Sequence, residues 1–181
     1  MDNGASSYRR FLEGDERAFE SIMQELFHGL IFFLCRYVHN PQTAEDLAID
    51  TFSDLIVHKH RYNFKVTLKT YLYMVGRSRA LDFLRKQKRF PLTELSETLP
   101  DDAMILEEMQ LIDEEKRRVH GAISQLSEDM QVVIHLIYFE DMTYDQAAKV
   151  MKKNRKQIDN LLYRAKKELR TILGKDGEEN L

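Results

Sequence analysis

Hydrophobic side chains recur at three- and four-residue spacing along the first half of the chain, which is the pattern of helices that bury one face. The first such stretch covers residues 18–38. Asp15 stands where an N-cap is expected, and Asn40-Pro41 should end the helix because the residue before a proline is disfavoured in the helical region. The inward positions of this helix are Ala18, Phe19, Ile22, Met23, Leu26, Phe27, Leu30, Ile31, Leu34, Tyr37 and Val38.

A second and a third helix follow from the same criterion. The second should begin at Thr43, and the third should run from Leu68 to about Lys88. With the first helix they predict an all-helical domain that ends near Arg89. The second helix would bury Leu47, Ala48, Thr51, Phe52, Leu55 and Ile56, and the third would bury Tyr71, Leu72, Val75 and Leu84.

Residues 91–112 separate this domain from a second region of helical periodicity. Pro91 and Pro100 interrupt the segment, and its charged residues are all acidic, which is typical of a partly extended linker. The predicted fold is therefore all-α, with an N-terminal helical bundle at residues 1–90, an acidic linker and a small C-terminal domain at residues 113–181.

The C-terminal domain has the local signals of a helix-turn-helix. Thr143 and Gln146 fit a capping box before the short helix DQAAKVM, and Asn154 is placed to cap a longer basic helix. Between them lies a tight polar turn at Lys152-Lys153. A short helix, a tight turn and a longer helix are the elements of a helix-turn-helix that binds DNA.

The outward face of the last helix carries side chains that suit the edges of DNA bases. In the major groove, arginine and lysine address guanine, asparagine addresses adenine, and aspartate accepts from the amino group of cytosine. Arg164 and Lys167 lie further along the helix, where phosphate contacts are expected. An ordinary helical hairpin with a soluble outer face is the alternative. The expected reading face consists of Asn154, Arg155, Lys156, Asp159, Asn160 and Tyr163.

Charge is segregated along the chain, although the formal net charge is only −3. Residues 93–115 carry acids and no lysine or arginine, whereas basic clusters lie on both sides, at residues 77–89 and 152–170. Solvated helix faces are one interpretation of each basic cluster. Two clusters around an acidic segment favour contact with a polyanion at two places.

The sequence offers little for catalysis. Glu45, Asp46, Asp50 and Asp54 project from the second helix, but no histidine or glycine-rich loop accompanies them, so a protein contact surface or a solvated face is favoured over a metal site. No phosphate loop, nucleophile elbow or Cys/His cluster is present, and we expect neither an enzyme nor a cofactor. The single cysteine, Cys35, falls on an apolar pattern and is expected to be a buried structural thiol.

The composition is that of a soluble protein, with 43% hydrophobic and 31% charged residues. No uninterrupted apolar run approaches the length needed to span a bilayer. The N-terminal sequence MDNGASSYRRF lacks the basic-then-apolar order of a secretory signal. The protein is therefore expected in the cytoplasm.

Three stretches, taken in order, resemble the second and fourth conserved regions of bacterial RNA polymerase sigma factors of the extracytoplasmic-function group. The resemblance covers about Tyr8 to Leu173, and the order of the stretches makes it specific. The linker is too short for the additional folded domain of larger sigma factors. The stretches are AEDLAIDTFSDLI, LKTYLYMVGRSRALDFLRKQKR and AISQLSEDMQVVIHLIYFEDMTYDQAAKVMKKNRKQIDNLLYRAKKEL.

The resemblance implies a protein that binds core RNA polymerase and directs it to promoter DNA. The helix-turn-helix would read the −35 element as duplex, and the acidic linker would enter the polymerase near the RNA path. An anti-sigma protein is a further partner that the family leads us to expect. The residues that match the segment binding the clamp helices of the polymerase's largest subunit are Glu45, Asp46, Ile49, Asp50 and Phe52, with Phe52 also a candidate for the core beneath that surface.

The resemblance also assigns the third helix, and the loop before it, to opening and reading the −10 element. Aromatic surface suits unstacked bases, and arginine and lysine suit the phosphates of a separated strand. Tyr71 and Leu72 are assigned to core packing. The expected −10 contacts are Tyr62, Asn63, Phe64, Lys65, Tyr73, Arg77, Ser78, Arg79, Arg85 and Lys86.

Two other classes of protein are the alternatives. A free-standing helix-turn-helix regulator would bind duplex DNA without polymerase, but it leaves the N-terminal motifs unexplained. A helical adaptor for protein contacts would show no salt-dependent affinity for DNA. Lys152 stands at the family's usual turn glycine, and Asp159-Asn160 replaces a more basic pair, so the −35 sequence is not expected to be that of the relatives.

Overall fold

The computed structural model describes residues 4–89 and 114–178 of the chain, and in the second range it describes the side chains of residues 117–174. All regular secondary structure within these residues is helical, and they form two compact units. The predicted all-α fold with two small domains is confirmed. The acidic linker predicted at residues 91–112 lies outside the described residues.

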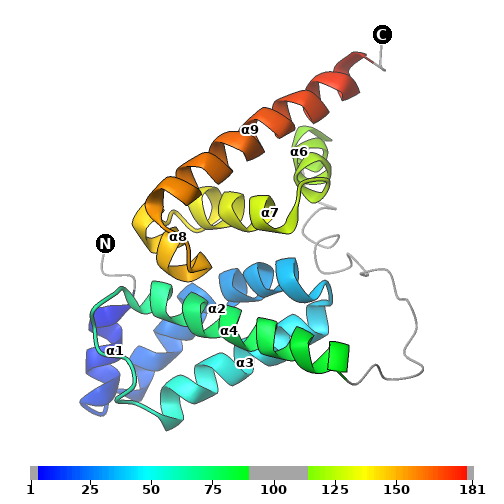
Figure 1. Ribbon diagram of the computed structural model, residues 1–181. Coiled ribbons are helices and arrows are strands. Elements are labelled where there is room, and N and C mark those ends of the chain that lie inside the picture. Colours follow the sequence, from blue (N-terminus) through cyan, green and yellow to red (C-terminus); the bar gives the residue numbers. More distant parts are fainter. Residues whose placement is uncertain (1–3, 90–113, 179–181) are drawn as a thin grey trace. The chain divides into compact units, whose positions relative to one another are not determined.

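The first unit is a helical bundle, drawn from blue to green in Figure 1. Its central helix, α2, contacts each of the others. The buried side chains of α2 are Ala18, Ile22, Leu26, Leu30, Ile31, Phe33, Leu34 and Tyr37, which confirms the predicted periodicity and adds Phe33. The helices are α1 (Ala5–Leu12), α2 (Glu16–Val38), α3 (Pro41–Val57) and α4 (Leu68–Arg89).

By length and overall composition, α2 is apolar enough to cross a membrane, although polar and charged residues interrupt its apolar positions, so that the helix contains no uninterrupted apolar run of that length. The helix is nevertheless amphipathic. Its buried residues pack against α1, α3 and α4, while Glu16, Arg17, Glu20 and Glu25 are exposed. A helix with a charged outer face and an apolar inner face is the expected core helix of a soluble bundle.

Side-chain caps set the start of α2 and of α3. Asp15 Oδ1 accepts a hydrogen bond from Ala18 N at 3.3 Å, as predicted. Asn40 Oδ1 accepts from Thr43 N at 2.8 Å, so that Asn40 is the N-cap of α3 and Pro41 is its first residue. Proline is favoured there because its missing N–H has no partner to lose. The predicted start at Thr43 was therefore two residues late.

The close approach of α4 to α2 depends on Gly76. A Cβ at this position would lie 3.1 Å from Leu30 Cδ1 and 3.4 Å from Leu34 Cδ2. Gly76 is buried, so the backbone of α4 itself forms part of the packed face. A larger residue here would have to push the leucines of α2 aside.

Cys35 is half-buried on α2, less than the sequence pattern predicts. Burial raises the pKa of its thiol to about 11. A thiol with this pKa stays protonated near neutral pH and is a poor nucleophile. The structural assignment of Cys35 agrees with this environment.

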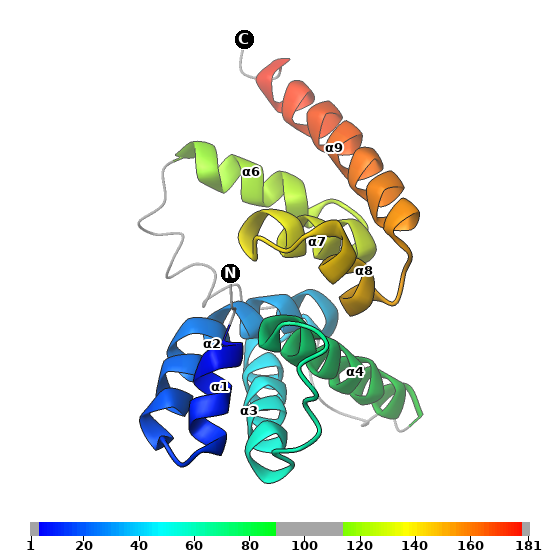
Figure 2. The same ribbon diagram turned by 90° about the vertical axis from the view of Figure 1, so that its left-hand side faces the viewer.

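The second unit contains α6 (Glu114–Ser124), α7 (Glu128–Ile134), η1 (His135–Phe139), α8 (Tyr144–Met151) and α9 (Arg155–Glu178). Both α6 and α7 pack against α9, and Figure 2 shows α8 leading through a short turn into α9. The π-helical turn η1 continues α7 and was not predicted. It ends beside a buried pair, in which His135 Nε2 lies 3.2 Å from Glu140 Oε1.

A capping box lies at the start of each helix of the helix-turn-helix, α8 before the turn and α9 after it. Thr143 N donates to Gln146 Oε1 at 2.7 Å, and Gln146 N donates to Thr143 Oγ1 at 3.3 Å, as predicted. Asn154 caps α9 in the same way: its Oδ1 accepts from Gln157 N, and its N donates to Gln157 Oε1, both at 2.8 Å. These bonds satisfy N–H groups that would otherwise lack a partner at the start of each helix.

Lys152 lies in the turn with a φ of 53°, a left-handed conformation that is unfavourable for a residue with a Cβ. We predict that Lys152→Gly raises the free energy of unfolding by about 1 kcal/mol, measured by chemical denaturation. Lys152→Ala keeps the Cβ and removes the rest of the side chain with its charge, so it should give no such gain. Equal stabilities of the glycine and alanine variants would contradict the assigned strain.

Candidate nucleic-acid interface

One face of α3 carries four of the five side chains predicted to bind core polymerase. Asp46 and Asp50 are exposed, and Ile49 between them is 47% exposed. Glu45 is half-buried at the edge of this face. The structure therefore brings an accessible aliphatic side chain together with carboxylates, an arrangement that suits a partner with an apolar patch and cationic groups.

Phe52 does not belong to this face. It is 2% exposed, and its ring centroid lies 5.7 Å from that of Phe27 and 6.2 Å from that of Phe19, both on α2. The assignment of Phe52 to direct polymerase contact is corrected, because its side chain faces α2. Its position beneath the surface is the alternative that the sequence had left open.

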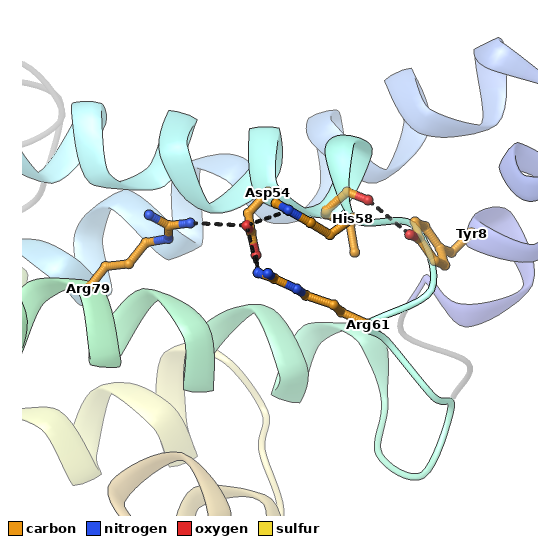
Figure 3. A network of polar contacts seen from close by, with 6 residues as sticks. Tyr8, Asp54, His58, Arg61 and Arg79 are labelled. Carbon is orange, nitrogen blue, oxygen red and sulfur yellow. Dashed lines mark hydrogen bonds and ion pairs between the residues drawn. The ribbon is translucent and has the colours of Figure 1, made fainter.

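Asp54, whose sequence position predicts one of the outward acids of α3, instead connects several segments of the first unit. Its side chain is only 15% exposed, and Figure 3 shows cationic side chains around it. Asp54 Oδ1 lies 2.9 Å from His58 Nδ1, 3.1 Å from Arg61 Nη1 and 3.5 Å from Arg79 Nη2. One carboxylate thus connects α3, α4 and residues 58–67 between them, the α3–α4 loop.

The α3–α4 loop holds four of the predicted −10 contacts. Asn63 and Lys65 are exposed, and Asn63 Oδ1 accepts a hydrogen bond from Lys65 N at 3.2 Å. Phe64 is half-buried with a φ of 60°. Tyr62 is 3% exposed and donates from its hydroxyl to Val66 O at 2.7 Å. Tyr62 is corrected to a packing residue, because its ring packs among those of Tyr8, Phe64 and Tyr71.

Tyr73, a predicted strand contact, is fully buried, with its ring centroid 4.8 Å from that of Phe33. It lies three residues before Gly76, on the face of α4 that packs against α2. This corrects its assignment to the DNA-contact surface. Tyr71, which was assigned to core packing, is less buried than expected: it is half-buried, and its ring centroid lies 5.2 Å from that of Tyr62. Burial, and then the nearby charge of Asp54, raise the pKa of Tyr71.

The middle of α4 carries two arginines whose side chains contact residues of α2 and α3. Arg77 Nε donates to Tyr37 Oη at 3.2 Å, and Arg79 lies beside Asp54. Both arginines are half-buried, whereas Ser78 between them is exposed. The arginine positions are thus fixed by α2 and α3, while Ser78 faces outward.

The C-terminal end of α4 is more open. Arg85 and Lys86 are exposed, and Arg85 pairs with Asp82 on the same helix. Asp82, Arg85, Lys86 and Arg89 line a surface hollow of about 200 Å³. Three of these four residues are cationic, so the hollow suits an anionic group such as a phosphate.

The predicted reading face of α9 is exposed throughout its first turns. Tyr163 is 70% exposed, and Arg155 Nη1 lies 3.0 Å from Asp145 Oδ2 of α8. Asn154 is exposed as well, but its side-chain oxygen is engaged in the cap. The residues that the structure places on the open surface are Asn154, Arg155, Lys156, Asp159, Asn160 and Tyr163, followed by Arg164 and Lys167.

Sequence reasoning missed two contributors to this arrangement. The first is α1, whose buried residues Tyr8 and Phe11 are too few to give a periodic signal. The second is the group of basic side chains around Asp54. The four-residue spacing of Asp54 and His58 could have indicated one ion pair, but the contact with Arg79 exists only in the folded bundle.

Comparison with family models identifies the two helical units. Residues 22–90 match the family model described as Sigma-70 region 2, and residues 116–169 match that described as Sigma-70, region 4. The two matches follow each other in the order of the units and together cover well over half of the chain. The chain belongs to the sigma-70 family. It is a sigma factor of the extracytoplasmic-function type, is not an enzyme, and directs RNA polymerase in promoter recognition and initiation.

Its curated relatives are sigma factors as well. The chain is 27% identical over 169 residues to the RNA polymerase sigma-H factor of Pseudomonas aeruginosa, covering 87% of this chain and 86% of the relative. It is 24% identical over 163 residues to the RNA polymerase sigma factor YlaC of Bacillus subtilis, covering 88% of this chain and 94% of the relative.

Two solved structures share the fold. The sigma factor RpoE of Bartonella quintana, in complex with the anti-sigma factor NepR, superposes with a TM-score of 0.63 at 18% identity, over 86% of this chain and 96% of that one. CnrH, in complex with the cytosolic domain of CnrY, gives a TM-score of 0.64 at 18% identity over 96% of each chain.

Proposed function

We propose that the two units of this sigma factor have separate promoter roles. The N-terminal domain, residues 1–90, binds core RNA polymerase and captures the −10 element, and the C-terminal domain, residues 113–181, reads the −35 element as duplex DNA. Residues 91–112 form the linker between them. The observation that carries the proposal is the exposed reading face of α9, which directly follows a capped turn. The family is soluble, and we place this protein in the cytoplasm.

The reading face of α9 has the chemistry required for a major groove. Arg155 and Lys156 supply donors for guanine, Asn160 supplies the paired donor and acceptor that adenine matches, and Asp159 accepts from cytosine. All four are exposed. The mixture of acid, amide and cation favours sequence-dependent reading over uniform attraction to phosphate.

The polymerase-binding surface that we propose consists of Glu45, Asp46, Ile49 and Asp50 on α3. Ile49 would be buried at the centre of the contact, where apolar area contributes most, and the acids around it would meet cationic groups of the partner. The family resemblance assigns this segment to the clamp helices of the polymerase's largest subunit.

For the −10 element, we propose that the exposed residues Asn63 and Lys65 meet an extruded base and its backbone at the α3–α4 loop. Ser78, Arg77 and Arg79 would follow on α4, and Arg85 and Lys86 would bind phosphates of the separated strand. Strand opening would draw on the binding of extruded bases, at a few kcal/mol per base, without hydrolysis of a nucleotide.

An anti-sigma protein is also among the partners that we propose. The supporting observation is that one structural relative was solved in complex with an anti-sigma factor. The similarity to that relative shows the shared fold, and it leaves the identity and the binding face of the partner to be determined by experiment.

The first test concerns the acidic face of α3. Asp46→Arg combined with Asp50→Arg is expected to abolish co-purification with core RNA polymerase, because it reverses both charges beside Ile49. Both positions are exposed, so the circular dichroism spectrum should be unchanged. A matched control reverses two exposed acids of α2, Glu20→Arg and Glu25→Arg, and should retain binding. Normal co-purification of the Asp46 and Asp50 variant would refute this surface.

The second test concerns base reading by α9. Arg155→Ala and Asn160→Ala should each cost about 1–3 kcal/mol at the base pair that they read and should relax specificity there. The measurement is competition binding with promoter fragments that vary in the −35 element. Arg164→Ala is the control: it should weaken binding equally for all sequences and lower the salt slope by about 1. A promoter profile unchanged by the first two variants would exclude their role in base reading.

A further inference from the structure

We propose that α1 holds the α3–α4 loop in the conformation that receives an unpaired promoter base, with Tyr8 as the positioning residue. The inference rests on the proposed −10 role of the loop. α1 covers Ala5–Leu12, outside the residues 22–90 that match the region 2 family model. Its residue Tyr8 is nevertheless among the most buried side chains of the first unit.

The hydroxyl of Tyr8 is a hydrogen-bond donor at the C-terminal end of α3. Tyr8 is fully buried, and its Oη lies 3.0 Å from Leu55 O and 2.9 Å from Lys59 O. Figure 3 shows this tyrosine close to the Asp54 group. The last carbonyls of a helix have no partner within the helix, so an external donor here fixes the path of the chain as it leaves α3. Burial raises the pKa of Tyr8 to about 12, and the hydroxyl therefore remains a donor throughout the neutral range.

The ring of Tyr8 supports the middle of the loop. Its centroid lies 5.6 Å from that of Tyr62 and 6.2 Å from that of Phe64. Phe64 has a φ of 60°, a conformation that a bulky residue keeps only when its surroundings hold it. The guanidinium of Arg9 lies 4.9 Å from the centre of the Phe64 ring, so α1 contacts Phe64 from two side chains.

The start of α1 reaches the other end of the loop. A Cβ on Gly4, the N-cap of α1, would lie 3.2 Å from Leu68 Cδ2, at the first residue of α4. α1 thus contacts the loop where it leaves α3, at its strained centre and where it enters α4. Asn63 and Lys65, the exposed loop residues, are presented from a backbone that is fixed at all three places.

The arginines of α1 provide a matched pair for the test. Arg9 and Arg10 are both exposed, but only Arg9 lies over Phe64, whereas Arg10 Nη2 lies 2.5 Å from Asp15 Oδ2, at the start of α2. Each full-length variant is assembled with core RNA polymerase. The probe is a fluorescent single-stranded oligonucleotide that carries the non-template −10 strand of a promoter mapped with the wild-type protein. Affinity for core polymerase and hydrogen exchange of the 58–67 amides are measured in parallel.

Tyr8→Phe removes one oxygen atom and keeps the ring. It is expected to weaken oligonucleotide binding about tenfold and to speed loop exchange, since the carbonyls of Leu55 and Lys59 lose the single donor that they share. Arg9→Ala should weaken oligonucleotide binding about twofold to fivefold. Arg10→Ala should leave it unchanged, and all three variants should keep the wild-type affinity for core polymerase.

Wild-type oligonucleotide binding by both Tyr8→Phe and Arg9→Ala would overturn the inference. An equal loss in Arg10→Ala would also overturn it, because the effect would then be one of overall charge. A parallel loss of polymerase affinity would reduce Tyr8 to a general role in stability and would exclude specific positioning. If the wild-type holoenzyme itself does not bind the oligonucleotide, the proposed −10 role fails, which is a result distinct from any difference between variants.

Discussion

The contacts of the Asp54 carboxylate are the interactions on which the proposed −10 site depends. The carboxylate is largely buried, and a buried charge is stable only when groups of opposite charge and hydrogen bonds surround it. Here His58 and Arg61 of the α3–α4 loop and Arg79 of α4 supply them. The same contacts fix the end of α3, the α3–α4 loop and one arginine of the proposed DNA surface. Because this one carboxylate needs several partners, it brings together residues that lie far apart in the sequence.

The helix-turn-helix is organised by local bonds instead. Reciprocal hydrogen bonds cap α8 and α9, and Lys152 takes a left-handed conformation in the turn between them. Because these caps use side chains close in sequence, they form within the helix-turn-helix itself. The exposed side chains of α9 are therefore free to vary with the DNA sequence to be read, while the cap residues preserve the helix start. This separation agrees with the departure of Lys152 and Asp159-Asn160 from the usual family residues.

The sequence was most informative where structure is local. The long helices, the Asp15 cap, the capping box at Thr143 and the cap at Asn154 all follow from spacing and side-chain chemistry over a few residues, and the structure confirms them. The side on which a residue of α4 lies was harder to predict. Tyr71 and Tyr73 exchanged their expected environments, because α4 is packed on more than one side and the closest approach to α2 occurs at Gly76. The hydrogen bonds of Tyr8 and the contact of Asp54 with Arg79 are tertiary contacts that no local pattern shows.

The central claim is that this chain selects promoters by reading two separate elements with its two domains. The most direct measurement is transcription in vitro by core RNA polymerase of the source organism on fragmented genomic DNA, with sequencing of the RNA 5′ ends. The account predicts discrete start sites that require this protein and share two upstream elements at a constant spacing. Core polymerase that neither binds the protein nor gains a start site would contradict the account.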